Sequence, residues 1–427
     1  MADNHRSPRP SGPLAGVRIL DLSRILAGPT ITQLLGDLGA DVIKIERPDR
    51  GDDTRSWGPP FLEGASPDNP GWSSYFLCAN RNKRSLALDI ARPEGQAIIR
   101  QLAGHSDVLV ENFKVGGLAR YGLSYGDLAD DLPELIYCSI TGFGQTGPLA
   151  PRAGYDAMVQ AMGGIMSLTG EPDGEPVKVG VGIADMVCGL YAGIAILAAL
   201  HHRERTGEGQ HIDASLFDTQ LAWLANEGVN YLTSGEVPKR RGNAHPNIVP
   251  YQVFPASDGH FMLAVGNDGQ FTKFCRVAGV AELANDPRFA TNPARIANRE
   301  ALIPLLRART ALKSRTFWIE TLGAAGVPCG AINNVAEAFA EPQAVARGDR
   351  LTMHDSKIAG GTADLIANPL KLSETPVDYR QFPPELGEHT DQVLREVLAM
   401  TREEINALKS AGVVRGPASN NADEEDS

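Results

Sequence analysis

The stretch VRILDLSRILAGPTITQLLGDLGADVIKIE, residues 17–46, decides the fold class. Residues 17–22 and 41–46 are short apolar runs typical of strands, and the segment between them, from AGP to Leu38, has the apolar spacing of a helix. Two strands joined by one helix form a βαβ unit, in which the strands run parallel. The stretch therefore predicts a parallel sheet.

The same alternation continues along the chain. Strand-like segments follow at residues 85–90, 107–113 and 135–144, with a helical segment at residues 93–103. Val, Ile and Leu occupy both parities of these strands, which predicts a sheet covered on both faces. We therefore expect an α/β, Rossmann-like domain with a mostly parallel sheet. Its first turn, SRILAGP, lacks the G-x-G-x-x-G pattern of nicotinamide and flavin sites.

The composition shifts after residue 224. A strand and a helix are expected in residues 209–223, and the following chain is rich in Pro, Gly and Asn, with strand-like QVF and HFMLAV around a Ser-Asp-Gly turn. We predict a large domain at residues 14–224, a smaller inserted α/β domain at 225–335 and a return to the large domain at 336–414, which ends in a helix started by Glu388 or Thr390. Residues 1–13 and the acidic residues 415–427 are predicted to be flexible tails.

Composition narrows the class of protein. The net charge of −12 argues against a nucleic-acid or anionic-membrane partner, and five scattered cysteines without a C-x-x-C pair indicate free, mostly buried thiols in a reducing compartment. There is no apolar signal segment, and the most apolar run, residues 189–200, is shorter than the ~20 residues that span a bilayer. We expect a soluble cytoplasmic protein. Motifs for zincin, EF-hand, P-loop and α/β-hydrolase chemistry are missing, and no metal site is predicted.

Asp185 is the candidate for chemistry. It lies in GVGIADMVCGLYAGIAILAALHHRER, residues 180–205, directly before a long apolar helix. One interpretation is a helix N-cap. The other is a nucleophile that the positive field of the helix N-terminus keeps ionised. The two roles are compatible. A phosphate site formed by Arg47 or by the cluster Arg81, Lys83 and Arg84 is a further hypothesis, beside the alternative that these charges are simply solvated.

Several motifs together resemble the class III CoA-transferase family, which is also called CaiB/BaiF. They run in order along nearly the whole chain: LDLSRILAGP, LGDLGADVIKIERP, NRNKRS, DVLVENF, SITGFGQTGP, AGYD, GIAD, RTGEGQHIDASL, GVPCG and LGEHTD. The resemblance implies a Rossmann-like large domain, a small inserted domain and an intertwined homodimer. It implies coenzyme A as an acyl-CoA substrate rather than a tightly bound cofactor.

The resemblance also implies roles for single residues. It makes Asp185 the catalytic nucleophile. It implies CoA contacts at matching positions, with Arg47 and Arg120 suited to the phosphates: Ile25, Leu26, Ala27, Arg47, Leu88, Asn112, Phe113, Arg120 and Tyr155. The formyl-CoA type has glutamine at the position of Leu26 and a glycine-rich loop where this chain reads RRGNAHPNIVPY, so formate-like substrates are not expected.

The strings WGPPF, NIVPYQVF and INNVAEAFAEPQ most resemble the succinyl-CoA:glutarate type. A dicarboxylic acceptor such as glutarate is therefore expected, with Arg240, Arg241 and His245 as candidates for its second carboxylate, unless they are only solvated loop residues. One alternative is an α-methylacyl-CoA racemase, but its second acid/base, a histidine, is replaced by Tyr155, and its glutamate falls near Pro255. A non-catalytic CoA-binding protein is the other alternative.

Overall fold

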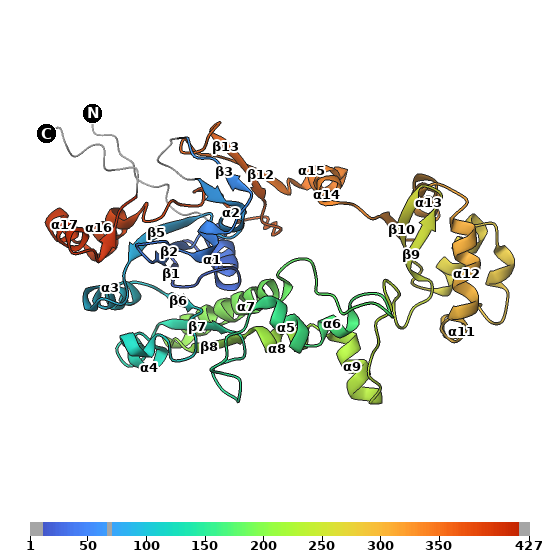
Figure 1. Cartoon of the computed structure of the whole chain (residues 1–427), viewed down its shortest axis with the longest axis horizontal. Coiled ribbons are helices and arrows are strands. Elements are labelled where there is room, and N and C mark those ends of the chain that lie inside the picture. Colours follow the sequence, from blue (N-terminus) through green and yellow to red (C-terminus); the bar gives the residue numbers. More distant parts are fainter. Residues whose placement is uncertain (1–11, 66–70, 418–427) are drawn as a thin grey trace. The chain divides into compact units, whose positions relative to one another are not determined.

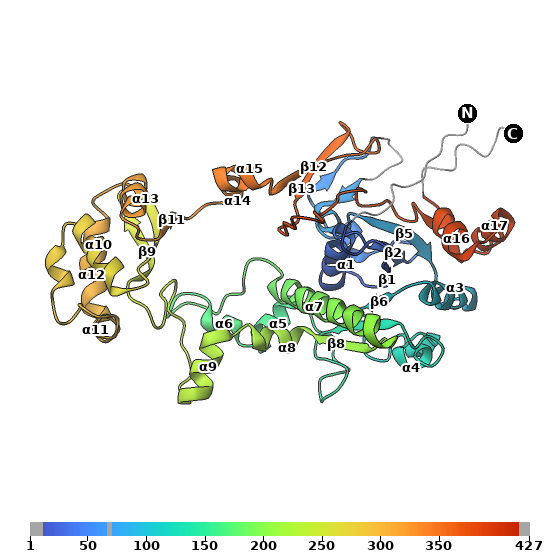
Figure 2. The same cartoon turned by 180° about the vertical axis from the view of Figure 1, so that it is seen from behind.

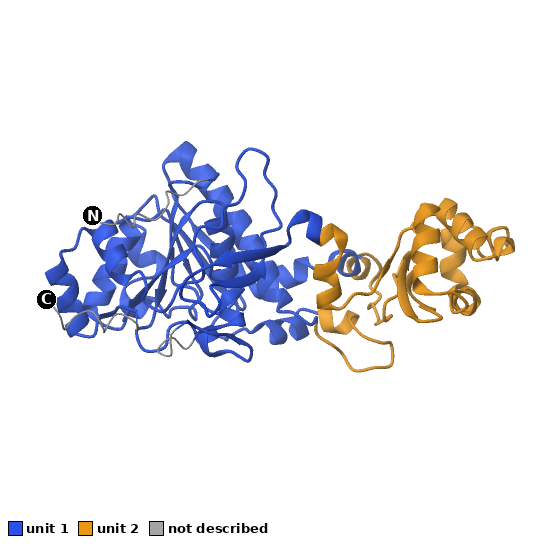
Figure 3. Ribbon diagram, turned by 90° about the horizontal axis from the view of Figure 1, so that it is seen from above, with its two compact units in different colours: residues 1–164, 179–229, 345–427 blue, residues 165–178, 230–344 orange. Residues whose placement is uncertain are grey.

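The computed structural model describes residues 12–65 and 71–417 and divides into two compact units. Unit 1 comprises Met1–Gly164, Val179–Val229 and Val345–Ser427, and unit 2 comprises Ile165–Lys178 and Asn230–Ala344 (Figure 3). The sequence placed the changes at 225 and 335, whereas the chain enters unit 2 at 230 and leaves it after 344. Ile165–Lys178, which the sequence assigned to the large domain, is a second part of unit 2.

Unit 1 is built on a seven-stranded sheet in the order β14-β5-β2-β1-β6-β7-β8, which is parallel except for the β14–β5 pair. Without the edge strand β14, the strands follow the order 3-2-1-4-5-6 of the Rossmann fold, and the order reverses between β1 and β6. The strands are β1 (Arg18–Asp21), β2 (Asp41–Glu46), β5 (Lys83–Leu88), β6 (Val108–Glu111), β7 (Ile136–Thr141), β8 (His211–Ser215) and β14 (Val414–Arg415).

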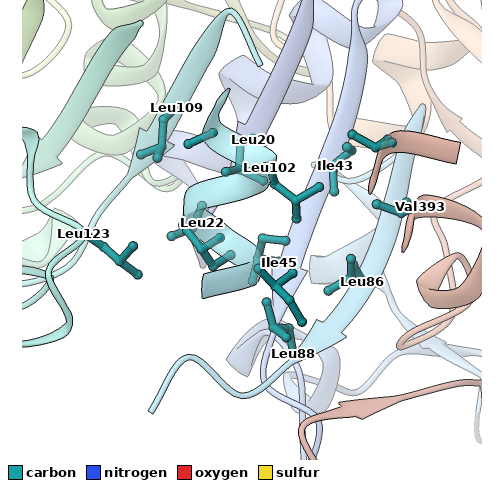
Figure 4. Close-up of a cluster of buried hydrophobic side chains, with 14 of the residues drawn as sticks. Leu20, Leu22, Ile43, Ile45, Leu86, Leu88, Leu102, Leu109, Leu123 and Val393 are labelled. Carbon is teal, nitrogen blue, oxygen red and sulfur yellow. The ribbon is translucent and has the colours of Figure 1, made fainter. Parts of the chain in front are cut away.

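Helices cover both faces of this sheet (Figures 1 and 2). Alternate strand residues divide between the faces, since Leu20 and Ile43 enter one core while Ile19 and Val42 enter the other. Figure 4 shows the first core, in which Leu102 and Val393 pack on the strands. The helices of the first face are α3 (Pro93–Gly104), α4 (Tyr125–Leu128), α16 (Thr390–Leu398) and α17 (Arg402–Ser410); those of the second are α1 (Ala27–Asp37), α5 (Asp156–Met162), α7 (Ile183–Thr206) and α8 (Leu216–Ala222).

Two glycines let α7 approach α1 closely. A Cβ atom at Gly189 would lie 2.6 Å from the carbonyl oxygen of Ala27, and one at Gly193 would lie 2.2 Å from Cδ1 of Ile31. A larger residue at Gly189 would meet backbone and push the two helices apart, whereas one at Gly193 would require the Ile31 side chain to move. The N-terminus of α7 is thereby held against the loop between β1 and α1.

By length and composition alone, α7 is long and apolar enough to cross a membrane, because it has 24 residues rather than the 12 of the apolar run noted in the sequence. Half of its apolar window is buried inside the protein. The core helix of a soluble protein passes the same test, so this is weak evidence for a membrane span.

The remaining elements of unit 1 form a satellite layer with its own small core around Trp72 and Phe382. They are β3 (Phe61–Leu62), β4 (Trp72–Ser73), α2 (Ser74–Leu77), β12 (Arg350–His354) and β13 (Thr362–Ile366), together with the 3-10 turn Asp53–Ser56. A second 3-10 turn, Ala119–Tyr121, belongs to the first face of the main sheet, where Tyr121 packs against the core.

Unit 2 has an antiparallel sheet in the order β11-β10-β9, packed with helices around a core that contains Phe261 and Trp318. Its elements are α6 (Ile165–Leu168), β9 (Tyr251–Ala256), β10 (Gly259–Ala264), α10 (Asp268–Val277), the 3-10 turn Ala281–Ala284, α11 (Asn292–Ala297), α12 (Arg299–Thr310), α13 (Arg315–Ala324), β11 (Cys329–Ala331) and α14 (Val335–Ala340); α9 (Ala225–Ser234) and α15 (Pro342–Arg347) cross its boundaries.

Several local expectations need correction. Residues 1–11 and 418–427 of the predicted tails lie outside the described residues, but Arg415 belongs to β14 and pairs with Ala87. The N-cap of α16 is His389, not Glu388 or Thr390, and no side chain caps it. All five cysteines are free, but Cys78 is exposed rather than buried.

Candidate active site

Two loops meet at the carboxyl edge of the sheet, where the strand order reverses. The loop after β1 carries Arg24, and the loop after β6 carries Asn112. The amide of Arg24 donates to Oδ1 of Asn112 at 2.9 Å, and Nδ2 of Asn112 donates to the carbonyl oxygen of Arg24 at 2.7 Å. Ligands of such folds bind at this point, so the Arg24–Asn112 pair marks the ligand edge.

Asp185 reaches the same edge from α7. It is the third residue of the helix, whose N-cap is Gly182, so the interpretation of Asp185 as the N-cap is wrong. A Cβ atom at Gly182 would lie 3.0 Å from Cδ2 of Leu26, which places the first turn of α7 against the loop after β1. Asp185 itself is half-buried. Asp185 is thus a half-buried carboxylate beside the loop at which folds of this kind bind their ligands.

Asp156 performs the capping role instead. Its Oδ1 accepts the amide hydrogen of Ala184 at 2.8 Å, and its Oδ2 accepts from Nε2 of Gln160 at the same distance. Burial, and then the neighbouring charge of Asp156, raise the pKa of Asp185 to about 7. Burial and Asp156 thus act against the field of the helix N-terminus, which favours the ionised form of Asp185. Asp156 is the aspartate of the AGYD motif, and no local pattern in the sequence relates it to Asp185.

Tyr75 is a second group that the sequence analysis missed. Burial, and then the charge of Asp185, raise the pKa of Tyr75 to about 12, so its hydroxyl keeps the proton and Asp185 lies within electrostatic range. The ring packs edge-on against Trp57, with centroids 5.0 Å apart. Trp57 lies in the quoted string WGPPF, but no local pattern relates Tyr75 to Asp185.

The residues that the family resemblance matches to CoA contacts differ in their exposure to solvent. Ile25 is partly exposed, and Leu26 and Ala27 are buried beside the α7 N-terminus. Arg47 is exposed and pairs with Asp49 at 2.7 Å.

The other matched residues lie around the same edge. Phe113 is partly buried below the guanidinium of Arg24, Arg120 is exposed, and Tyr155 is 66% exposed. Leu88 is the exception, because its side chain is buried in the core of the first sheet face and is not presented to a ligand.

The basic cluster does not form a phosphate site. Arg81, Lys83 and Arg84 are all buried, and each is paired with a carboxylate: Asp37 at 2.6 Å, Asp21 at 3.1 Å and Asp41 at 2.6 Å, respectively. Their charges are neutralised by carboxylates within unit 1. The hypothesis of a phosphate site in this cluster and the alternative that its charges are solvated are therefore both wrong.

The three acceptor candidates belong to unit 2. Arg240 donates to backbone carbonyl oxygens of Glu171 and Gly174 at 3.1 and 2.7 Å, so it ties Ile165–Lys178 to the rest of unit 2. Arg241 is exposed and donates to the carbonyl oxygen of Lys239 at 3.2 Å. Nδ1 of His245 accepts from the amide of Asn247 at 3.1 Å. Arg240 is thus a structural residue in unit 2.

Among residues 12–65 and 71–417, no group of three or more His, Cys, Asp or Glu side chains could hold a metal ion.

Comparison with known proteins agrees with this arrangement. The family model described as CoA-transferase family III matches residues 14–390. The succinate–glutarate CoA-transferase of Agrobacterium fabrum is 49% identical over 397 residues, which cover 92% of this chain and 98% of that protein. The human succinyl-CoA:glutarate CoA-transferase is 44% identical over 402 residues, covering 94% and 90%.

A solved structure gives the same assignment. A CaiB/BaiF family protein from Brucella suis superposes with a TM-score of 0.80 at 51% identity, covering 91% of this chain and all of that one. With a Rossmann-type sheet and a carboxylate at its ligand edge, the chain belongs to CoA-transferase family III.

Proposed function

We propose that the chain transfers CoA from succinyl-CoA to glutarate, with Asp185 as the nucleophile. The observation that carries the proposal is the placement of this half-buried carboxylate in the first turn of α7, against the loop after β1. The choice of substrates is supported by the names of relatives that are 44–49% identical over most of their length.

The proposed reaction consists of four acyl-transfer steps, each a nucleophilic substitution at a carbonyl carbon. Asp185 attacks the thioester of succinyl-CoA and expels CoA thiolate, which leaves a mixed anhydride. The thiolate then attacks the aspartyl carbonyl and releases succinate, giving an aspartyl-CoA thioester. Glutarate attacks the aspartyl carbonyl of this thioester and expels CoA thiolate, which leaves a second anhydride, and the thiolate then attacks the glutaryl carbonyl of that anhydride. Glutaryl-CoA leaves, and the carboxylate of Asp185 is regenerated.

The protein contributes position and charge to these steps. Only ionised Asp185 attacks, and its pKa of about 7 leaves roughly half of it ionised at neutral pH. Backbone amides of the glycine-rich segment 139–148 are proposed to stabilise the tetrahedral oxyanions. Ile25, Leu26 and Ala27 are proposed to contact CoA through the loop, and Arg47 and Arg120 are proposed to bind its phosphates.

The acceptor site and the assembly are further parts of the proposal. Arg241 and His245 are proposed to bind the second carboxylate of glutarate, because Arg241 is an exposed guanidinium and His245 follows it in the same segment of unit 2. Arg241→Met is then expected to raise the KM for glutarate about tenfold, the loss of one charge-assisted hydrogen bond. An unchanged KM would remove Arg241 from the acceptor site.

A homodimer is proposed because α7 exposes an apolar stripe: Leu190 is 47% exposed, Ile194 65% and Leu197 41%. Such a stripe marks an interface, and a second copy of this chain is the partner that the family resemblance implies. If a second copy covers this stripe, α7 is a core helix of the dimer, and the proposed protein is soluble and cytoplasmic. Light scattering should give a dimer mass, and Ile194→Asp should shift it toward monomer. Leu312→Asp, at an equally exposed position of unit 2, should leave the mass unchanged.

Asp185→Asn tests the nucleophile. The amide cannot form the anhydride, so transfer should fall at least about a thousandfold, whereas CoA binding by calorimetry should persist. Hydroxylamine added with succinyl-CoA should trap a hydroxamate on Asp185, visible by peptide mass spectrometry. Substantial transfer by the variant would remove the assignment. Solvent deuterium entering a 2-methylacyl-CoA without CoA transfer would favour the racemase, and binding without turnover or trapping would favour the non-catalytic protein.

A further inference from the structure

We propose that the buried ion pair of Lys44 and Asp52 is a positioning device that holds the loop of residues 23–27 in the shape that receives acyl-CoA. The inference rests on the proposed function, because that function makes this loop the CoA contact. Neither residue touches the substrate in this proposal. Both act through the backbone of the loop.

The loop contains one residue in an unfavourable conformation. Ile25 has a φ of 73°, in the left-handed region that β-branched residues rarely adopt. Such a conformation persists only where surrounding contacts enforce it, and it is concentrated at ligand sites. The contacts that enforce it therefore set the shape of the loop from outside the ligand site.

Asp52 supplies one such contact. The amide of Ile25 donates to both carboxylate oxygens of Asp52, at 3.2 and 3.3 Å. The same carboxylate accepts from the amide of Thr54 at 3.0 Å and from its hydroxyl at 2.8 Å. Lys44 completes the set by donating its Nζ at 2.9 Å. Asp52 is thus fixed from two sides while it holds Ile25.

Lys44 supplies a second contact to the loop. Its ammonium group also donates to the carbonyl oxygen of Ser23 at 3.0 Å, two residues before Ile25. The side chains of Lys44 and Asp52 are both completely inaccessible to solvent. Lys44 is the last but two residue of β2, so the rigid sheet fixes the loop at both Ser23 and Ile25.

Two further buried ion pairs lie next to Lys44 and Asp52. Asp21 pairs with Lys83 at 3.1 Å, and Glu46 pairs with Arg55 at 2.7 Å. With Lys44 and Asp52, these groups form three opposite pairs beneath the loop. A buried charge that loses its partner costs free energy, so the side chains of these three pairs have few alternative positions. Hydrophobic residues could fill this space, but they would not form hydrogen bonds with the backbone of Ser23 and Ile25.

The first experiment measures CoA affinity by titration calorimetry, and kcat for transfer, in the full-length protein. In Asp52→Asn one amide oxygen, which has two lone pairs, is left for the four donors that the carboxylate accepts, so these donors from Ile25, Thr54 and Lys44 cannot all be satisfied, and Lys44 loses its counter-charge. We expect CoA affinity to fall about tenfold, equal to about 1.4 kcal/mol, and kcat to change less than about twofold because Asp185 is untouched. Asp37→Asn is the matched control. Asp37 is a fully buried, ion-paired carboxylate at the other end of α1, and its loss should not alter CoA affinity.

The second experiment distinguishes positioning from general damage. Glycine adopts a positive φ without strain, so in an Ile25→Gly background Asp52→Asn should lower CoA affinity by less than about threefold. If Asp52→Asn does not fold, Thr54→Val replaces it. That variant removes one hydrogen bond to Asp52, and we expect about a threefold loss of affinity that disappears with Ile25→Gly.

Equal losses in the two backgrounds, or an equal loss in Asp37→Asn, would overturn the positioning role. The proposed function fails separately, if the wild-type protein binds CoA but transfers none. A wild-type protein that does not bind CoA would overturn both.

Discussion

Replacing Asp156 by asparagine should make the enzyme active at lower pH. The amide oxygen can still accept from Ala184, as Oδ1 of Asp156 does at 2.8 Å, so the start of α7 should be preserved. The negative charge that helps to raise the pKa of Asp185 is removed. The change at Asp185 itself is electrostatic, whereas the hydrogen bond that Nε2 of Gln160 donates to Oδ2 of Asp156 is lost, so the stability of the variant is measured beside its activity.

The size of the effect follows from the two causes. The pKa of Asp185 rises from 3.8 to about 7, and burial contributes more than Asp156 does. Asp156 therefore accounts for less than half of the rise, and we expect its loss to lower the pKa by about one unit, or about 1.4 kcal/mol. Because only the carboxylate attacks, kcat/KM falls as pH falls through this pKa. At pH 6 roughly a tenth of Asp185 is ionised in the wild type and about half in the variant, which is a gain of roughly fivefold.

The assay is the pH dependence of kcat/KM for succinyl-CoA with glutarate, between pH 5 and pH 9 at constant ionic strength. The acidic limb should move from about 7 in the wild type to about 6 in Asp156→Asn. Asp107→Asn is the control, because Asp107 also accepts a backbone amide, from Arg18 at 2.7 Å, but it pairs with Arg203 in the last turn of α7. A folded Asp156→Asn variant with an unmoved limb would refute the electrostatic reasoning.

Three further predictions concern stability and binding. Burial raises the pKa of Glu111 from 4.5 to about 7, so the folded protein holds this proton more tightly than the unfolded chain, and the stabilisation is lost as pH rises toward 7. Glu111→Gln should thus gain up to about 3 kcal/mol of unfolding free energy relative to wild type between pH 5 and pH 8 in urea titrations; parallel pH profiles would contradict this. Gly189→Ala should cost about 2 kcal/mol of stability, because its Cβ meets the Ala27 carbonyl oxygen at 2.6 Å. Gly126→Ala, with nothing within 4 Å of its Cβ, should leave the melting temperature unchanged, and equal losses would argue against the close approach. Arg47→Met should weaken CoA binding about tenfold with unchanged stability, since Arg47 is exposed; unchanged affinity in calorimetry would remove Arg47 from the CoA site.

The sequence alone indicated the parallel strands of the large sheet, but not its antiparallel edge strand β14. Residues 41–46 were predicted as a strand and form β2, because a run of Val and Ile buried on both faces has few other stable conformations. The motif order also indicated the family, which the family model and the relatives confirm. The strand pattern is a local signal. The family signal is the fixed order of short motifs along the chain.

Only the tertiary structure decided which groups act on one another. Asp185 precedes an apolar run and therefore looked like an N-cap, but Asp156, 29 residues earlier, accepts the amide of Ala184 and raises the pKa of Asp185. Lys83 looked available to a phosphate, but it is buried against Asp21 of β1. The left-handed Ile25 carries no local signal, because its conformation depends on Asp52, from the loop after a different strand. Hydrogen bonds and ion pairs between distant segments depend on the packing of the sheet and helices, which local sequence patterns do not encode.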